Sequence, residues 1–254
     1  STLTLTSGTT VGTNGTVDIT SLFAGETSAA DDNNTITLPG SNPEKEINAA
    51  KGEKDYMYAT ATASATSSTA SLTMKHALAM VTFKFYKDDT FAGTGKLTKI
   101  ELKKVETDGA FKTGTATMNI SSGTIDASSG SDGTLTRFTN SNGVNDGYTI
   151  GTLPTTGSSD EDKKAAIPGF SMLVYPNTSL AANKVKAVFT IDGVKYPINI
   201  PAVTSDSNEW AAGYNTIYTV KMKGKELEIS VSVTQWADAT VSSELVPIDQ
   251  TPKN

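Results

Sequence analysis

The feature that most constrains this chain is a regular alternation of apolar and polar residues between positions 185 and 233. Its clearest stretch places aliphatic side chains at Leu227, Ile229, Val231 and Val233. Successive side chains of a β-strand point to opposite faces, so a period of two puts one set of side chains on a buried face. Asp192–Gly193 and Lys223–Gly224 indicate turns between such strands. This region therefore predicts antiparallel strands packed as a sandwich.

Three more strands follow from the same alternation. Their apolar faces comprise Val185, Ala187, Phe189 and Ile191, then Val194, Tyr196, Ile198 and Ile200, then Tyr214, Thr216, Tyr218, Val220 and Met222. Pro197 and Pro201 indicate that the middle strand lies at a sheet edge, because proline has no N–H to donate to a neighbouring strand.

Composition extends this expectation to the whole chain. Serine and threonine make up 65 of the 254 residues, and charged residues only 19%. Threonine is β-branched and favours the pleated surface of a sheet over a helix. We therefore expect an all-β protein. The only helix that the sequence predicts covers residues 45–51, after the cap-like Asn42–Pro43–Glu44.

Charge and cysteine content exclude several classes of function. The net charge is −6 and Arg137 is the single arginine, so no basic stripe suited to nucleic acid is present. The chain has no cysteine, which removes disulfides, thiol nucleophiles, zinc–thiolate sites and iron–sulfur clusters. It also has no run of 18 apolar residues and no export leader. Because Ser1 is an unusual start, we expect that a segment preceding it has been removed.

The order of these signals predicts two sandwich domains in tandem. Residues 154–169 combine proline, glycine, serine and a cluster of charges, which is typical of a linker. We therefore expect domains at 1–160 and 161–254. Within the first, residues 72–86 predict one strand that is buried on both faces or bulged, and Asp108–Gly109 predicts a hairpin between residues 96–105 and 110–120.

The residues that carry chemistry are few. His76 is the only imidazole and lies within an apolar strand, so a structural role is favoured over catalysis. The segment from Asp126 to Gly133 shows a faint resemblance to a calcium loop, but Arg137 stands where the bidentate glutamate is required, and we interpret it as a turn. Trp210 and Trp236 are favoured as core or rim residues over sugar-stacking platforms. We expect no catalytic, metal or cofactor site.

The C-terminal segment over residues 237–254 follows the last predicted strand and has no second half of a hairpin to pair with. Its aliphatic residues are Val241, Leu245, Val246 and Ile248. These are too few to form a core, and a lone strand is not stable by itself. Two interpretations remain open. The segment completes its own domain, or it adds a donor strand to the sheet of another molecule.

Several motifs resemble the fimbrillin superfamily, the type V pilins of Bacteroidales. Leu72–Tyr86 (LTMKHALAMVTFKFY) is similar to a family strand with a His-Ala-x-Ala-x-Val-x-Phe pattern. Tyr196–Gly213 and Tyr214–Gly224 resemble its Trp-small-Gly signature and the Tyr-x-Val-rich strand that follows. Leu227–Trp236 resembles its penultimate strand, and Leu173–Pro176 the first strand of its C-terminal domain.

This resemblance implies two transthyretin-like β-sandwich domains and export as a lipoprotein precursor. It also implies that a protease removes an N-terminal strand at a site upstream of Ser1, opening a groove that a neighbour's strand fills. The expected function is a non-enzymatic shaft subunit of an outer-membrane-associated fimbrium at the cell surface. Its expected partners are further copies of itself and the tip and anchor subunits.

The alternative is a tip or anchor subunit, or a surface lipoprotein adhesin that binds glycans or host matrix. The C-terminal segment distinguishes these possibilities, because a tip subunit needs a groove but no donor strand.

Overall fold

Nearly all the regular structure of this chain is β-strand. The computed structural model describes residues 16–23, 35–38, 44–46, 55–64, 70–105, 111–128, 130–138, 147–177, 184–201, 210–236 and 239–243. Their elements are β1 (Thr16–Phe23), β2 (Thr35–Leu38), β3 (Glu44–Glu46), β4 (Met57–Ser64), β5 (Ala70–His76), β6 (Ala79–Lys87), β7 (Lys96–Lys104), β8 (Ala116–Asn119), β9 (Ile125–Asp126), β10 (Thr134–Phe138), β11 (Tyr148–Thr149), α1 (Asp160–Ala165), β12 (Gly169–Val174), β13 (Val185–Ile191), β14 (Val194–Asn199), β15 (Tyr214–Lys223), β16 (Glu226–Gln235) and β17 (Ala239–Ser243). The expectation of an all-β fold is confirmed.

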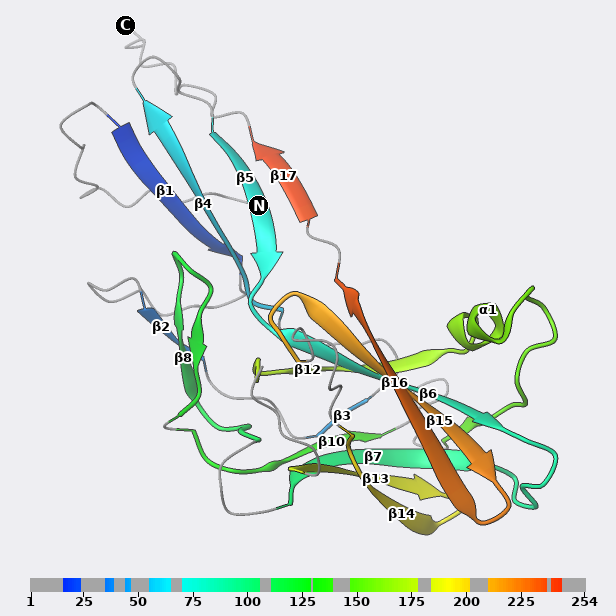
Figure 1. The fold of residues 1–254 in the computed structure, drawn as a ribbon. Helices are drawn as coiled ribbons and strands as arrows, with labels where there is room; N and C mark the ends of the chain where they lie inside the picture. The colour runs from blue at the N-terminus through cyan, green and yellow to red at the C-terminus, as the bar shows by residue number, and fades with distance from the viewer. Residues whose placement is uncertain are drawn as a thin grey trace, which may run out of the picture.

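Two sheets face each other across the main core (Figure 1). One has the strand order β14-β13-β7-β10-β3, with β11 also paired to β7, and the other has the order β12-β6-β15-β16. Aromatic rings join them: Phe189 of the first sheet lies edge-on to Phe83 and Phe85 of the second, at centroid distances of 5.2 and 5.0 Å. All three side chains are almost completely buried. The period-two faces of the sequence therefore form the interior of a sandwich.

Both predicted hairpins of the C-terminal region are confirmed. β13 and β14 are joined by Asp192 and Gly193, whose φ angles are +50° and +76°, as a two-residue turn between twisted strands requires. The Asp192 carboxylate also accepts hydrogen bonds from the backbone N–H groups of Gly95 and Lys96 at 2.9 and 2.8 Å. The second hairpin joins β15 to β16 through Gly224, with φ +58°.

Two expectations about strands differ from the structure. The residues at 72–86 form two strands, β5 and β6, that separate at Ala77–Leu78 and enter different sheets. The hairpin predicted at Asp108–Gly109 is wrong, because β7 lies in the sandwich whereas β8 pairs with β2 and β9. Both errors arise because an apolar run or a turn dipeptide does not specify the partner of a strand.

The helix predicted over residues 45–51 is also not found where the structure describes that segment. Glu44–Glu46 form β3, which pairs in parallel with β10, so pairing with a neighbouring strand has overridden the local helix signal; residues 47–51 lie outside the described part. The helix of the described chain is α1, inside the expected linker. Ser159 caps it by accepting from the N–H of Asp162, whose side chain accepts from the N–H of Ser159.

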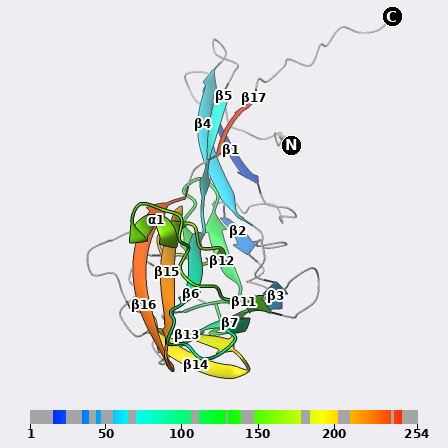
Figure 2. The ribbon, with the colours of Figure 1, turned by 90° about the vertical axis from the view of Figure 1, so that its right-hand side faces the viewer.

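The expected division at residue 160 falls between segments that share both sheets. β6 lies before it, and its two neighbours, β12 and β15, lie after it. The β6–β15 pair is parallel, and β7 pairs antiparallel with β13 across residue 160 in the other sheet. The linker-like composition of residues 154–169 therefore marks a surface connection that carries α1 on the way from β11 to β12 (Figure 2).

A second group of strands extends away from the sandwich (Figures 1 and 2). Its strand order is β1-β4-β5-β17, and the short sheet β2-β8-β9 lies beside its base. No helix in the described part of the chain is long and apolar enough to cross a membrane.

Candidate assembly site

The start of the predicted donor segment is a strand at the edge of the extended sheet. β17 pairs antiparallel with β5, from Ala239 opposite Met74 to Ser243 opposite Ala70, and Val241 stands opposite Leu72. Leu245, Val246 and Ile248 lie outside the described residues. The structure thus places one of the four predicted residues, and places it beside a strand of the same chain.

The extended sheet consists of two ribbons joined at their base. β1 pairs with β4 along eight residues of each strand, and β17 pairs with β5 along five. β4 and β5, in contrast, pair only at Met57–His76 and Tyr58–Lys75. Beyond this point the facing sides of β4 and β5 have no strand partner among the described residues, and Figure 1 shows the two strands diverging.

Among the side chains that the structure describes in these ribbons, a small buried cluster comprises Ala59, Leu72 and Met74. Two-stranded ribbons are marginal in water, since they bury too little surface to offset the entropy lost on ordering. The pairing of β17 with β5 adds a ladder of five residue pairs to this sheet.

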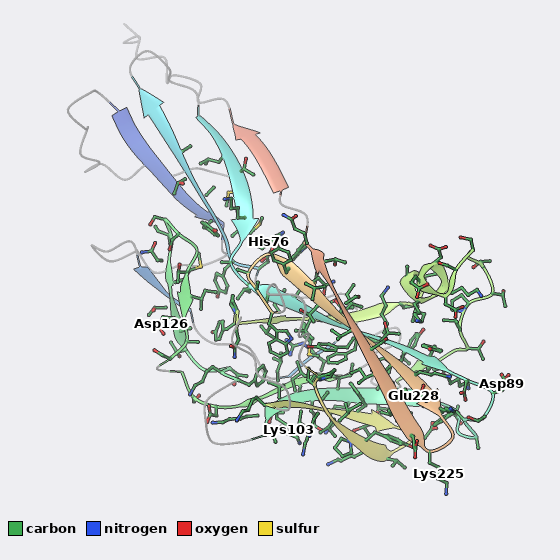
Figure 3. All side chains as sticks on the ribbon, viewed as in Figure 1. His76, Asp89, Lys103, Asp126, Lys225 and Glu228 are labelled. Atoms are coloured by element: carbon green, nitrogen blue, oxygen red, sulfur yellow. The ribbon has the colours of Figure 1, made fainter. Side chains whose placement is uncertain are left out.

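His76 lies where the extended sheet meets the sandwich (Figure 3). Its Nδ1 is 2.8 Å from Oδ2 of Asp55, and its ring stacks on Trp236 with centroids 3.6 Å apart and planes 8° apart. The ring is 7% exposed. Trp236 directly follows β16, so this stack fixes the position of the chain at the start of its connection to β17.

Asp55 is held in a partly desolvated position beside His76. Burial raises the pKa of the Asp55 carboxyl, and the charge and hydrogen bond of His76 lower this pKa by less. Its second oxygen, Oδ1, is buried without a hydrogen-bond partner among the described residues. The sequence predicts a structural role for His76 but gives no sign of Asp55, because 21 residues separate the two and no local pattern links them.

The calcium-like segment is a turn, as expected. Asp126 accepts from the N–H of Ser128 at 2.8 Å, which closes an Asx turn, and Asp132 pairs with Lys104 and Lys112 at 2.6 and 3.0 Å. Arg137 lies in β10 with its side chain 2% exposed. In the part of the chain that the structure describes, no cluster of three or more metal-ligating side chains occurs.

Trp210 is a core residue, as favoured from the sequence. It is 1% exposed, and its indole N–H donates to the hydroxyl of Tyr218 at 3.0 Å. Its edge borders an open hollow of about 200 Å³. The hollow is lined by Phe111, Lys112, Ala127, Ser128, Tyr175, Pro176, Asn177 and Trp210. Lys112 is paired with Asp132, so the charged group of this hollow is already neutralised.

Comparison with solved structures shows that this fold recurs in proteins of Bacteroides. A protein from Bacteroides ovatus with a proposed role in cell adhesion superposes with a TM-score of 0.60 at 13% identity, covering 88% of this chain and 69% of its own. A similar protein from Bacteroides uniformis gives 0.54 at 16% identity, covering 87% and 73%. A fimbrial protein from Bacteroides vulgatus gives 0.50 at 16% identity, covering 89% and 73%.

Comparison with curated proteins gives no match. The family-level comparison is decisive. The sequence matches the model of the fimbrillin-like family over residues 12–236, which includes both sheets of the sandwich and most of the extended sheet. The chain therefore belongs to the fimbrillin-like family.

Proposed function

We propose that this chain is a structural shaft subunit of a cell-surface fimbrium, without catalytic activity, that polymerises by adding its C-terminal segment to a neighbour's sheet. Family membership supports the role of a fimbrial subunit. The observation that carries the assembly step is the edge position of β17, which is hydrogen-bonded to β5 on one side only among the described strands. A strand held by a single ladder can be exchanged for the same strand of a second molecule.

The acceptor in this proposal is β5. When β17 leaves its own chain, β5 loses this neighbour, and β17 of another copy takes its place in the same register, with Val241 opposite Leu72. Leu245, Val246 and Ile248 follow in the sequence and extend the apolar contact. Because donor and acceptor are different surfaces, each copy donates to the next, and the contact generates an open filament.

The proposal includes a processing step and a location. The chain is exported as a lipoprotein precursor to the outer membrane, where a protease removes an N-terminal strand before the β17 of a neighbour replaces the chain's own β17 on β5. The resulting fimbrium contains further copies of this chain, with separate tip and anchor subunits. Such processing has a physical basis. A donor strand gains little free energy of binding on a flat sheet edge, and it binds well only where a preformed apolar groove accepts it.

A double variant, Thr73→Cys with Thr240→Cys, tests the exchange. The two threonines stand opposite each other in the β5–β17 register, and the chain has no cysteine of its own. Oxidation of assembled protein is expected to give a ladder of disulfide-linked multimers on a non-reducing gel. Exclusively internal disulfides in a sample that contains filaments would contradict the proposal. Thr73→Cys alone is the control and gives no ladder.

Truncation after Trp236 provides a second measurement. We expect a folded monomer that forms no filaments in electron micrographs, and Leu245→Asp should act in nearly the same way by placing an unpaired charge in the groove. Filaments of normal length from the truncated chain would show that the segment only completes its own domain.

A further inference from the structure

The free edge of β16 is a second place where this chain can join another molecule. β16 ends the strand order β12-β6-β15-β16 and pairs only with β15 among the described strands. It runs for ten residues, and no shift of register interrupts its pairing with β15. In Figure 2 it lies at the outer margin of its sheet. An edge of this length presents a row of backbone N–H and C=O groups to solvent.

The pairing with β15 shows which backbone groups point outward. Lys223 and Glu226 are the pair that closes the two-residue turn, so they exchange hydrogen bonds, and every second pair after them does the same. The N–H of Trp236, which donates to the carbonyl of Gly213, follows the same pattern. The even-numbered residues of β16 are thus satisfied by β15. The outward groups belong to Leu227, Ile229, Val231, Val233 and Gln235.

The opposite sheet ends in an edge that is protected. In β14 the same counting from Ile191–Val194 places the backbone nitrogen of Pro197 on the outward side, where it offers no N–H. Lys195 adds a charge to that edge. β16 contains no proline and no lysine. Its four aliphatic side chains are only half-buried, although Leu227, Ile229 and Val231 pack against the core of the sandwich, so they retain apolar surface that a further strand would cover.

We propose that β16 pairs antiparallel with β16 of a second copy of this chain, about a two-fold axis at Ser230. Side chains directly opposite in an antiparallel pair share a face. With the axis at Ser230, Leu227 faces Val233 and Ile229 faces Val231, so every aliphatic side chain meets another. Glu226 then faces Thr234, and Glu228 faces Ser232.

Other registers are poorer. An axis at Glu228 sets two carboxylates directly opposite each other, and an axis at residue 227 sets Glu226 against Glu228, both of which are destabilising. An axis at Val231 places Leu227 against Gln235. The register at Ser230 also brings the outward N–H and C=O groups into line, which allows about eight main-chain hydrogen bonds across the axis.

This contact differs in kind from strand exchange through the C-terminal segment. The same surface is used by both copies, so the contact closes on itself and makes a pair, not a chain of subunits. Within a fimbrium it joins two subunits, or two filaments, side by side. It does not require β17 to leave β5, and its success or failure is independent of the proposed filament.

Single cysteines test the register, because this chain has none of its own. Ser230→Cys places two thiols directly across the axis in a non-hydrogen-bonded pair, where the Cα atoms lie about 4.5 Å apart and a disulfide can form. Oxidation is expected to convert most of this variant to a covalent dimer. Glu228→Cys is the matched control: its two Cα atoms lie about 13 Å apart along the strands, too far to be bridged. Equal cross-linking of the two variants, or none for Ser230→Cys, would overturn the proposal.

A second variant acts on the backbone. Val231→Pro removes an outward N–H that β15 does not use, so the monomer is expected to keep its β-sheet circular dichroism spectrum while its dimer, measured by sedimentation, weakens at least tenfold. Unchanged dimerisation would contradict the proposal. If Val231→Pro does not fold, the cysteine pair decides alone. Mixing Ser230→Cys with Leu245→Cys tests the other occupant, since a dominant mixed disulfide would identify the C-terminal segment, and not β16, as the strand that binds this edge.

Discussion

At the scale of single residues, His76 links the extended sheet to the sandwich. Its hydrogen-bond distance to Asp55 and its stack on Trp236 join the start of β4, the end of β5 and the end of β16. Burial raises the pKa of Asp55. A carboxyl whose pKa is raised by folding contributes stability at low pH that is lost as the pH rises through its folded pKa. His76 limits that loss, since its charge and hydrogen bond lower the pKa of Asp55.

His76→Gln tests this structural role. Glutamine can still donate to Asp55 but cannot stack on Trp236, so we expect a loss of about 1–2 kcal/mol in the free energy of unfolding. The measurement is urea denaturation of the purified chain, with filament yield recorded in parallel. Lys75→Gln, at the exposed neighbouring position of β5, is the control and should change stability by less than about 0.5 kcal/mol. Unaltered stability of His76→Gln would rule out the junction described here.

At the scale of elements, Tyr175 connects the segment after β12 with the loop before β8. Its hydroxyl donates to the carbonyl of Gly114 at 3.0 Å. Its ring packs against the small cluster that includes Tyr56 and Met118. Burial, and to a lesser extent the nearby Tyr56, raises the pKa of Tyr175 to about 12. This hydrogen bond helps to hold the segment before β8 against the segment that follows β12.

The pH dependence of stability follows from this shift. A tyrosine with a raised pKa contributes stability that is fully present below its unfolded pKa of about 10 and is lost as the pH rises toward 12. We expect Tyr175→Phe to be less stable than the parent by about 1 kcal/mol at pH 8 and to lose less stability than the parent between pH 10 and 12. Chemical denaturation at each pH measures both. Tyr196→Phe, on β14, is the control; parallel curves for the parent and Tyr175→Phe would show that Tyr175 does not carry the alkaline transition.

At the scale of the whole molecule, the sandwich is assembled from segments that are distant in the sequence. β6 and β15 lie side by side in parallel although more than 120 residues separate them, and β7 lies between β10 and β13. Strands before and after residues 154–169 therefore bury one shared core. The division into domains at 1–160 and 161–254 stays a prediction, which separation of the two halves can test.

A specific protease site inserted between Thr155 and Thr156, which are both exposed, tests this interdependence. After cleavage we expect the two pieces to remain associated and to elute with the intact chain in native buffer, and to separate only in denaturant. The uncleaved insertion variant is the control. Two separate folded species in native buffer would instead support independent domains at 1–160 and 161–254.

The sequence alone determined the features that depend on neighbouring residues. The alternation from Leu227 to Val233 specified a strand and its buried face, and Asp192–Gly193 specified a turn, because both follow from local backbone geometry. The cap of α1 also depends only on nearby residues, because Ser159 pairs with Asp162, although the charge cluster around it is equally typical of a linker.

Only the tertiary structure decided which strands became neighbours. The pairing of β6 with β15, the contact of His76 with Asp55 and the position of β17 beside β5 are all long-range. An alternation with a period of two fits any partner that covers the apolar face. It therefore predicts that one face of the strand is buried, but it does not identify the strand or sheet that buries it. The partner is chosen by the total apolar surface that the whole chain can bury at once, which no single segment contains.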